Sequence, residues 1–337
     1  MVLLKAMAYG AGSFEIARWL QKLDVDYLAV AYIDEGVSLR QKGIFTPIMV
    51  LNPELDGFHN LIRHQLEPEI YSLELLDELI AHLDKSDKTT QLSIHLNIDT
   101  GMHRLGFSPK EIPQLIERIQ DNPHLKIASV FTHLAASESQ SDDDFTQLQL
   151  DLLDASVAQL KDRLKIDFLV HAANSAGILR SKTTNHHMVR LGIGFYGVDS
   201  SATQQSSLAW AFKWKSEISQ IIPISIGETV GYGRQWKAYK NTRIATIPIG
   251  YADGINRHLG KGKGQLYLQG KGFPIIGQVC MDMLMIDLGN YPCQVGDEVS
   301  IFENFDQMNR LCQQLDTIPY EILTSISQRV KRIYLEE

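Results

Sequence analysis

The sequence predicts an α/β protein in which a (β/α)8 barrel of the TIM type is followed by a C-terminal antiparallel β domain. Up to Gly197, short apolar runs alternate with stretches whose apolar residues recur at i, i+3 and i+4, as in parallel strands joined by helices. After Gly197, the runs alternate apolar and polar residues and are separated by Gly, Asn and Pro, which is typical of antiparallel sheets. For the first part, a doubly wound sheet is the competing architecture.

Eight apolar runs are the expected barrel strands, and the amphipathic stretches between them are the expected helices. The strands are Val2–Lys5, Tyr27–Ala31, Pro47–Leu51, Glu69–Ser72, Leu92–Ile98, Ile127–Thr132, Phe168–His171 and Met188–Tyr196. The helices are Phe14–Leu23, Ile33–Lys42, Leu73–Leu83, Glu111–Gln120 and Asp142–Leu164. Ser13 and the pair Ser108-Pro109 are typical helix starts. The third and seventh connections, Glu54–His64 and Ala176–Ser181, are shorter.

The polar, low-complexity segment Ser200–Ser207 is the expected linker. We therefore place the barrel at residues 1–204 and the β domain at residues 205–337. The expected strands of the β domain are Lys213–Ile222, Thr242–Pro248, Gln265–Leu268, Gly277–Asp287 and Glu298–Phe302, with one short helix at Asp306–Leu315.

The composition is that of an ordinary globular protein: 44% of the 337 residues are hydrophobic, 21% are charged and the net charge is −8. This acidic balance argues against a nucleic-acid-binding surface. The three cysteines and the histidines lack metal-binding spacing, so no metal is expected. No apolar run approaches the roughly 18 residues of a membrane span, and no signal-peptide pattern opens the chain. The sequence therefore predicts a reduced, cytoplasmic location.

Lys5 ends the first apolar run and is followed by the glycine-rich segment Ala6–Gly12. A lysine in a buried strand loses hydration, which lowers the pKa of its amine and leaves a neutral nucleophile suited to Schiff-base chemistry. The glycines allow the backbone to approach a ligand closely. The alternative is a strand-end lysine whose ammonium group reaches solvent.

Polar side chains also follow later strands, at the edge where the active sites of such barrels lie. His133 follows the sixth strand, His171 ends the seventh and Ser175 comes after it, and Arg190 lies within the eighth. Strand-end histidines are more often structural than catalytic, but a guanidinium buried in an apolar strand needs a partner, such as the ring nitrogen of a pyridine cofactor. Ser175 and the segment Gly192–Gly194 offer hydroxyl and NH groups to a phosphate.

Two segments of the β domain, around Tyr251 and Met281, do not by themselves indicate a functional site. Tyr251 lies in the turn IGYADG, where a tyrosine is usually a surface residue. Met281 lies in the run VCMDM, and such methionines usually pack in a core.

Six motifs, in one order along the chain, resemble those of the alanine racemases: KAMAYGAG, DTGMHRLGF, HAANSAG, VRLGIGFYG, IPIGYADG and CMDMLMIDL. Members of that family are pyridoxal-phosphate enzymes with a barrel and a C-terminal β domain. The resemblance implies that this chain interconverts L- and D-alanine by a two-base mechanism and supplies D-alanine for peptidoglycan. It also implies a homodimer with shared active sites.

The resemblance further implies a role for each site residue. Lys5 would hold the cofactor as an aldimine and act as one base, and Tyr251, contributed by the partner subunit, would be the other. The remaining implied contacts are Tyr9, Ser175, Gly192 and Ile193 with the phosphate, Arg190 with the pyridine nitrogen, His133 under the cofactor ring, and Arg104 and the Met281 backbone with the substrate carboxylate.

The sequence departs from the family pattern at several places. Asn97 stands where many relatives have a lysine, often carbamylated, that orients the substrate-binding arginine, and an amide there is expected to hydrogen-bond Arg104 without neutralising it. Gln328 stands where some relatives have a tyrosine that lines the site, which bears on selectivity between alanine and serine. The strand and helix that open the family's chains are absent. The motif details resemble most the racemase domains fused behind a muramoyl-tripeptide ligase, so a fusion to an upstream peptidoglycan-precursor ligase is one expectation for the full-length protein.

Two other functions stay open on the sequence alone. One is a barrel-fold amino-acid decarboxylase, although the glycine-rich phosphate motif and the catalytic cysteine of that family have no good match here. The other is a non-catalytic pyridoxal-phosphate-binding barrel protein, although that family lacks a C-terminal β domain.

Overall fold

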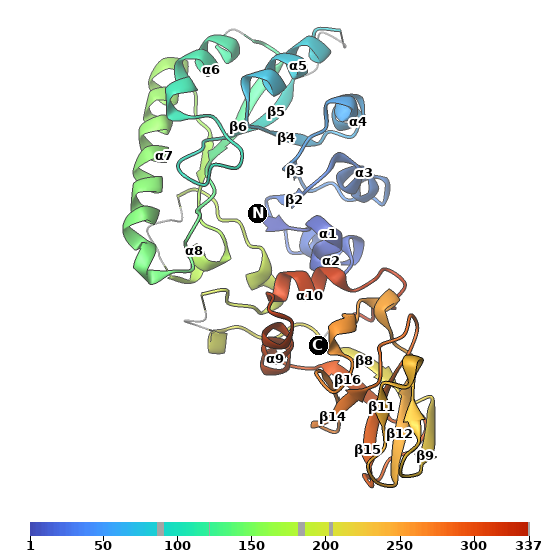
Figure 1. Cartoon of the computed structure of the whole chain (residues 1–337). Coiled ribbons are helices and arrows are strands. Elements are labelled where there is room, and N and C mark those ends of the chain that lie inside the picture. Colours follow the sequence, from blue (N-terminus) through green and yellow to red (C-terminus); the bar gives the residue numbers. More distant parts are fainter. Residues whose placement is uncertain (86–90, 121, 181–185, 202–204, 336–337) are drawn as a thin grey trace. The chain divides into compact units, whose positions relative to one another are not determined.

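The computed structural model of the chain describes residues 1–85, 91–120, 122–180, 186–201 and 205–335. The chain divides into two compact units, which Figure 1 shows in the colours of the sequence. The first comprises Met1–Ala8, Gly12–Phe195 and Asp199–Leu208, and the second comprises Tyr9–Ala11, Tyr196–Val198 and Ala209–Glu337. Residues 202–204 of the expected linker, and with them the expected domain boundary, lie outside the described residues, as do Ser181 of the seventh connection and the last two residues of the chain.

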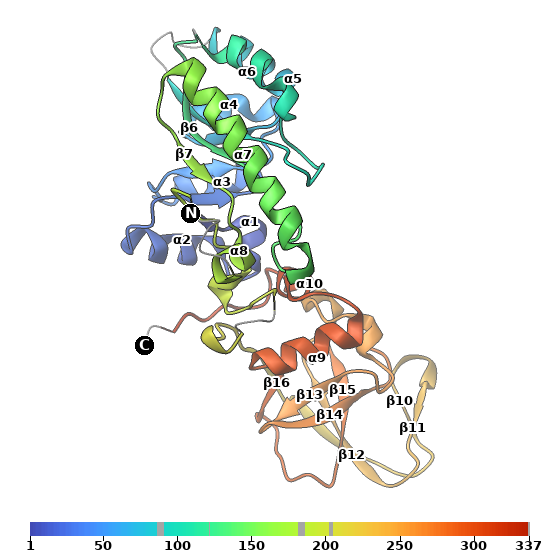
Figure 2. The same ribbon diagram turned by 90° about the vertical axis from the view of Figure 1, so that its left-hand side faces the viewer.

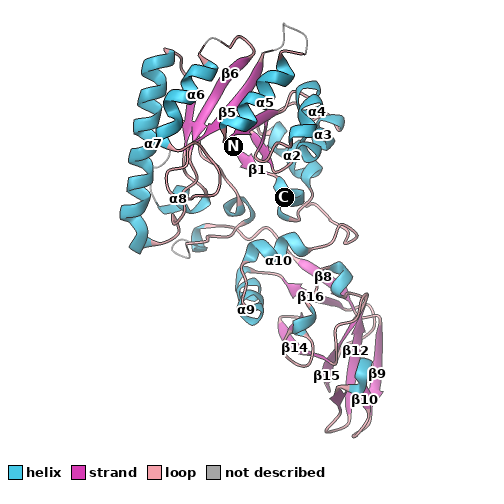
Figure 3. Cartoon of the chain, turned by 45° about the horizontal axis from the view of Figure 1, so that its top comes forward, coloured by secondary structure: helices cyan, strands magenta, loops and turns pink. Residues whose placement is uncertain are grey.

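The first unit is a curled parallel sheet whose strands follow one another in chain order, β1 to β7 (Figure 3). Its strands are β1 (Val2–Leu3), β2 (Leu28–Val30), β3 (Ile48–Val50), β4 (Glu67–Ile70), β5 (Leu92–Asn97), β6 (Leu125–Phe131) and β7 (Leu169–His171). Neighbouring strands pair in parallel register, for example Leu28 with Ile48 and Ala29 with Met49. The sequential order confirms the TIM-like barrel and excludes a doubly wound sheet, in which the strand order reverses.

The expected eighth strand at Met188–Tyr196 is wrong as a continuous strand. Single parallel bridges join this stretch to β7, from Met188 to His171, and to β1, from Leu191 to Val2. Residues 193–196 turn into a 3-10 helix. The ladder breaks off because the NH groups of Gly192 and Gly194 donate to a side chain rather than to a neighbouring strand. The stretch still spans the gap between the last strand and the first.

Helices lie on the outer side of this sheet (Figure 3). They are α2 (Ser13–Lys22), α3 (Ile33–Gln41), α4 (Phe58–Arg63), α5 (Leu73–Leu83), α6 (Ile112–Ile119), α7 (Asp143–Leu164) and α8 (Ser175–Arg180), with 3-10 turns at Leu55–Gly57, Pro109–Glu111, Gln140–Asp142 and Gln205–Ser207. The prediction for α5 is confirmed at both ends. The Ser72 hydroxyl accepts a hydrogen bond from the NH of Leu75 at 3.2 Å, and four buried leucines at i, i+3 and i+4 spacing form its inner face.

The second unit is built on a seven-stranded antiparallel sheet in the order β8-β16-β13-β14-β15-β12-β9. Its strands are β8 (Trp214–Glu217), β9 (Gln220–Ile224), β12 (Thr242–Ile247), β13 (Gln265–Leu268), β14 (Lys271–Ile276), β15 (Leu284–Gly289) and β16 (Glu298–Phe302). A separate hairpin pairs β10 (Thr229–Val230) with β11 (Trp236–Lys237). Helix α9 (Phe305–Leu315) follows β16 and lies beside it (Figure 2), and α10 (Pro319–Ser325) comes next.

Two strand predictions in this unit are wrong in extent. The run Lys213–Ile222 is two strands, because the NH of Ile218 donates to Asp297 and the NH of Ser219 to Thr246, which lie on different neighbours. The run Gly277–Asp287 begins well before β15. Strand β14 is missing from the prediction because its glycine and proline read as a turn.

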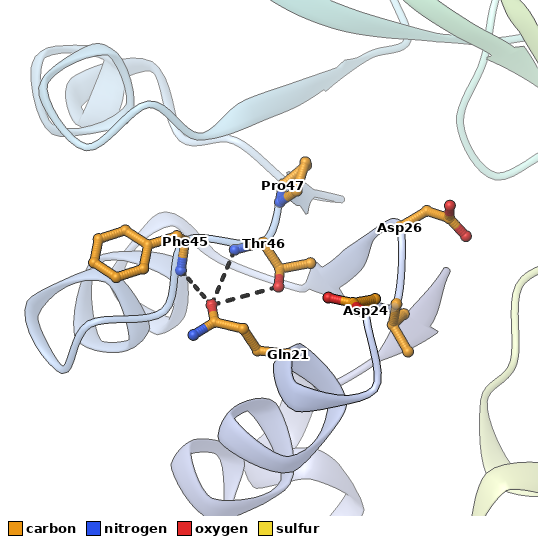
Figure 4. A pocket seen from close by; sticks show the side chains of 7 residues that line it. Gln21, Asp24, Asp26, Phe45, Thr46 and Pro47 are labelled. Carbon is orange, nitrogen blue, oxygen red and sulfur yellow. Dashed lines mark hydrogen bonds between the residues drawn. The ribbon is translucent and has the colours of Figure 1, made fainter.

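A surface depression lies at the end of the first unit where β2 and β3 begin (Figure 4). It is lined by Gln21, Asp24, Val25, Asp26, Phe45, Thr46 and Pro47. The Gln21 side-chain oxygen accepts hydrogen bonds from the NH groups of Phe45 at 2.6 Å and Thr46 at 3.2 Å, which ties α2 to the loop before β3. Lys5 follows the carboxyl end of β1, at the opposite edge of the parallel sheet, so this depression is not the candidate active site.

Candidate active site

Lys5 follows β1 (Val2–Leu3) after one intervening residue, Leu4, and is partly buried. Burial lowers the pKa of its amine, and the charge of Arg104 lowers it further, against the opposing charges of Glu35 and Glu69. Among the described residues, its Nζ has no hydrogen-bond or ion-pair partner. An amine with a lowered pKa and no partner is a ready nucleophile and proton acceptor.

The segment after Lys5, labelled α1 (Lys5–Tyr9), which the sequence predicts to be a glycine-rich turn, is a left-handed turn. Ala6, Met7, Ala8 and Tyr9 all have φ between 52 and 55°. Each such residue costs about 1–2 kcal/mol, because its Cβ approaches the following carbonyl oxygen. The turn is held by bonds from the Ala8 NH to the Leu4 oxygen at 2.7 Å and from the Ala6 NH to the Glu35 carboxylate at 2.8 Å. Strain of this kind concentrates at functional sites.

Arg190 is 4% exposed, and its guanidinium is held by four acceptors. Nη1 donates to His171 at Nδ1 (2.6 Å) and at the carbonyl oxygen (3.4 Å), while Nη2 donates to the carbonyl oxygens of Thr132 (2.8 Å) and Ala172 (2.9 Å). Its Nε–H has no partner among the described residues. Burial lowers the pKa of Arg190 to about 10, so the group stays protonated at neutral pH. One fixed donor is therefore left for an acceptor such as a pyridine nitrogen.

His133 follows β6, as the sequence predicts. Burial lowers its pKa to about 3, and the charges of Arg190 and Arg104 act in the same direction. The charge of Lys5 does so as well. The imidazole is therefore neutral, and a neutral ring suits stacking against an aromatic cofactor among cations. His133 therefore lies close enough to Arg190, Arg104 and Lys5 for their charges to affect its pKa.

Ser175 opens α8, and its hydroxyl oxygen accepts hydrogen bonds from the NH groups of Gly192 at 3.0 Å and Gly194 at 3.1 Å. A Cβ at Gly194 would lie 3.2 Å from the Ser175 side chain, so the glycine permits this close approach. Ile193 between them is fully buried. Because the Ser175 oxygen already accepts two bonds, its O–H is available to donate, which suits an anion such as a phosphate. The structure brings these three predicted phosphate contacts together.

Asn97 does not bond Arg104, contrary to expectation. Its amide donates to the Glu69 carboxylate at 2.8 Å and to the Leu105 carbonyl oxygen at 3.4 Å, while Arg104 is exposed and has no hydrogen bond within the described residues. Glu69 is 4% exposed, and burial raises its pKa to about 7, although the Asn97 bond and the charges of Arg190, Arg104 and Lys5 oppose that shift. Glu69 was not predicted as a site residue, because its only signal in the sequence is that it is acidic within the apolar run LEPEI.

Tyr9 belongs to the second unit, where its ring packs 5.2 Å from that of Tyr196 and 5.9 Å from that of Tyr320. Burial raises the pKa of the Tyr9 phenol. Gly10 follows at φ +81°, and a Cβ there would lie 2.1 Å from the Leu323 carbonyl oxygen. Only glycine fits this position, which explains the glycine after the tyrosine.

Tyr251 and Met281 lie side by side in the second unit. The NH of Tyr251 donates to the Cys280 oxygen and the NH of Ala252 to the Met281 oxygen, each at 3.0 Å. A Cβ at Gly250 would lie 2.3 Å from the Met281 oxygen, so the turn requires glycine before the tyrosine. Tyr251 is 41% exposed and Met281 53% exposed. Neither is a core residue, and the turn presents both at the surface of the unit.

The turn that contains Tyr251 is fixed by a buried carboxylate. Asp253 accepts a bond from the Gly250 NH at 2.8 Å and a two-point ion pair from Arg329 at 2.7 and 3.0 Å. Arg329 also donates to Asp282 at 2.8 Å, one residue after Met281. Gln328, next to this arginine, is exposed. The ion pairs therefore hold the Tyr251 turn and the Met281 segment in one arrangement.

Two negative findings bear on other classes of function. No cluster of three or more His, Cys, Asp or Glu side chains able to hold a metal ion occurs among the described residues. No helix in the described ranges is long and apolar enough to cross a membrane.

Known proteins resemble the chain over both units. Family models for the N-terminal and C-terminal domains of alanine racemase match residues 1–200 and 211–334. An alanine racemase of Treponema denticola is 38% identical, over 99% of this chain and 90% of that protein. Among solved structures, an alanine racemase of Clostridium difficile 630 has a TM-score of 0.90 at 32% identity, over 99% of this chain and 88% of that one.

A third match bears on the cofactor. The crystal structure of alanine racemase from Bartonella henselae with covalently bound pyridoxal phosphate has a TM-score of 0.87 at 30% identity, over 99% of this chain and 92% of that one. Since both family models and relatives above 30% identity extend over nearly the whole chain, it belongs to the alanine racemase family.

Proposed function

We propose that this chain interconverts L- and D-alanine with pyridoxal phosphate as its cofactor, and that Lys5 and Tyr251 are the two acid/base groups. One observation carries the proposal: a lysine amine of lowered pKa lies within electrostatic reach of a buried arginine whose Nε–H is free among the described residues. A pyridine nitrogen is an acceptor that fits this donor, and a carbonyl carbon is an electrophile that fits this amine.

The residues of the first unit fit the cofactor at its two ends. Arg190 would donate its Nε–H to the ring nitrogen, and the neutral His133 would lie under the ring. The Ser175 hydroxyl, with Gly192 and Ile193 behind it, would bind the phosphate. Tyr9 is a further phosphate contact that we propose on resemblance, because it belongs to the second unit.

Racemisation needs a proton removed from one face of the α-carbon and delivered to the other, so two positioned groups are required. When bound, the cofactor supplies an electron sink for the charge left at that carbon. Lys5 Nζ would take or give the proton on one face and the Tyr251 phenol on the other. Arg104 and the Met281 backbone would bind the substrate carboxylate and hold the α-carbon between them.

We propose that Tyr251 acts on the site of a second subunit, so that the homodimer has two shared sites. The tyrosine is 41% exposed and lies in a turn fixed by Asp253 and Arg329. An exposed side chain held in one position suits a residue that completes the active site of a partner subunit. We further propose a cytoplasmic location and a supply of D-alanine to peptidoglycan. A fusion to an upstream peptidoglycan-precursor ligase stays a prediction, which the mass of the native gene product tests.

Mixing two inactive variants tests the shared sites. In a dimer of one Lys5→Ala chain and one Tyr251→Phe chain, one site loses both groups and the other keeps both. Random mixing yields such dimers half the time, so about a quarter of wild-type activity should return. If both groups act within one chain, mixing restores nothing, and the shared-site proposal is wrong.

A further inference from the structure

A chain of buried hydrogen bonds leads away from Arg190 through the barrel interior. Arg190 Nη1 lies 2.6 Å from His171 Nδ1, and His171 Nε2 lies 2.9 Å from the Ser129 hydroxyl oxygen. That oxygen lies 2.7 Å from His95 Nδ1, and His95 Nε2 lies 2.9 Å from a carboxylate oxygen of Glu67. Four successive contacts therefore join the guanidinium to a carboxylate.

The chemistry of its two ends determines the direction of every bond. A guanidinium only donates, so His171 accepts at Nδ1 and must hold its proton at Nε2, which donates to Ser129. A carboxylate only accepts, so His95 holds a proton at Nε2. With the ring neutral, its Nδ1 accepts, which leaves the Ser129 hydroxyl to donate there. Ser129 is thus the one member that both accepts and donates through a single oxygen. All four bonds point from Arg190 to Glu67.

This series of hydrogen bonds crosses the sheet from β7 to β4, and its middle members are buried. Glu67 begins β4, His95 and Ser129 lie within β5 and β6, and His171 ends β7. The series of hydrogen bonds therefore extends from the amino ends of the strands to their carboxyl ends. The three middle members are fully buried, whereas the Glu67 side chain is 17% exposed. Burial also holds the pKa of His171 well below its ordinary value, which keeps that ring neutral.

Aromatic rings cover the two histidines. The Phe131 ring is parallel to the His171 imidazole at 4.8 Å, and the Tyr27 ring meets the His95 imidazole edge-on at 5.6 Å. The Arg190 guanidinium lies 5.1 Å from the centre of the Phe131 ring. This packing restricts the rotation of both imidazole rings, so the bond from Arg190 Nη1 to His171 depends on how the hydrogen-bonded series is polarised.

We propose that Ser129 is a positioning residue for Arg190, and that Glu67 is the negative end of a polarised chain that fixes the guanidinium so that its Nε–H faces the cofactor ring. The second half of this statement rests on the proposed function. Loss of the Ser129 hydroxyl leaves the His171 Nε2–H without an acceptor and the His95 Nδ1 without a donor. The bond from Arg190 Nη1 to His171 Nδ1 then loses the support of an oriented imidazole, although the three carbonyl acceptors and every charge in the site are still present.

The first test reads the chain itself and needs no turnover. Histidine-selective 15N labelling of the full-length protein, with His95 and His171 assigned by single replacements, gives the tautomer of each ring. We expect a protonated Nε2 and a bare Nδ1 on both. A proton on Nδ1 of either ring, or a cationic ring, would overturn the proposal. If the expected tautomers are found in a protein that does not racemise alanine, the polarised series of hydrogen bonds is supported and the proposed function is wrong.

The second test compares three variants. Ser129→Ala removes the hydroxyl and Ser129→Thr keeps it. Ser156→Ala is a matched control, since Ser156 is another buried serine whose one partner among the described residues is the Leu152 oxygen of its own helix. A loosened guanidinium lets water protonate the ring nitrogen, which strengthens the electron sink and favours protonation at the wrong carbon. The readout is pyruvate released per alanine racemised, together with the absorption spectrum of the bound cofactor.

For Ser129→Ala we expect this ratio to rise by up to roughly tenfold, the upper end of what one hydrogen bond between neutral groups supplies, together with a shifted spectrum. Ser129→Thr and Ser156→Ala should match the wild type. An unchanged ratio and spectrum in Ser129→Ala would refute the positioning role. If Ser129→Ala does not fold, the tautomers of the wild type decide, because a proton on Nδ1 of either imidazole would refute the positioning role.

Discussion

Replacing Glu69 with glutamine removes a buried titratable carboxyl group while keeping the shape of the side chain and its bond from Asn97. Burial raises the pKa of Glu69 to about 7, against an ordinary value of 4.5. A carboxyl group with a raised pKa in the folded state stabilises the fold below its unfolded pKa. That contribution is lost as the pH rises through the folded pKa. The wild type should therefore lose stability between about pH 4.5 and pH 7, and Glu69→Gln should not.

The magnitude follows from the pKa difference. Each pKa unit corresponds to about 1.4 kcal/mol, so the shift of Glu69 corresponds to about 3 kcal/mol over this pH window. Relative to the wild type, Glu69→Gln should thus gain about 3 kcal/mol in free energy of unfolding between pH 4.5 and pH 8. Other titrating groups are common to both proteins and cancel in the difference.

Urea unfolding of the cofactor-free protein, at several pH values and one protein concentration, measures this difference. Asp77→Asn is the matched control, because Asp77 is half exposed in an ion pair with Arg118 and a surface pair contributes little. Its difference from the wild type should vary little with pH. A Glu69→Gln difference that stays constant with pH, or changes in the opposite direction, would refute the assignment of a raised pKa to Glu69.

Three further predictions concern the proposed reaction. Lys5→Ala should abolish the absorbance of the lysine-bound cofactor, whereas replacing the exposed Lys22 should not; a normal spectrum in Lys5→Ala would place the cofactor elsewhere. Tyr251→Phe should impair proton abstraction from L-alanine more than from D-alanine, since each base acts on one face, and equal losses in solvent-exchange rates of the two isomers would count against this assignment. Arg190→Glu should raise transamination relative to racemisation, because a guanidinium that does not give up its proton limits charge build-up in the cofactor ring. The pyruvate formed per racemisation turnover measures this ratio. An unchanged ratio would count against the proposed role of Arg190.

Hydrophobic periodicity predicted the seven strands of the first sheet and most of its helices, because each strand is buried and each helix has one apolar face. It failed where local hydrogen bonds override the pattern. Residues 188–196 are apolar, but their glycine NH groups bond Ser175 instead of a strand. The left-handed turn after Lys5 has no hydrophobic signature, because pattern reasoning assumes right-handed geometry.

The candidate site was predictable only in part for a related reason. Lys5 and Arg190 stand out as charges in apolar runs, and the family resemblance adds Tyr251 and Met281. Glu69 and Ser129 depend on which residues of neighbouring strands share the barrel interior, such as the pairing of Glu69 with His95 and of His95 with Ser129. A single sequence does not contain that register.

Racemisation of alanine is measured most directly by circular dichroism of L-alanine incubated with the protein and pyridoxal phosphate. The signal should decay to zero while the total alanine concentration stays constant, and D-alanine should give the mirror-image decay to the same endpoint. A signal that persists would contradict the claim, as would a decay that follows the loss of alanine itself, which a decarboxylase would cause.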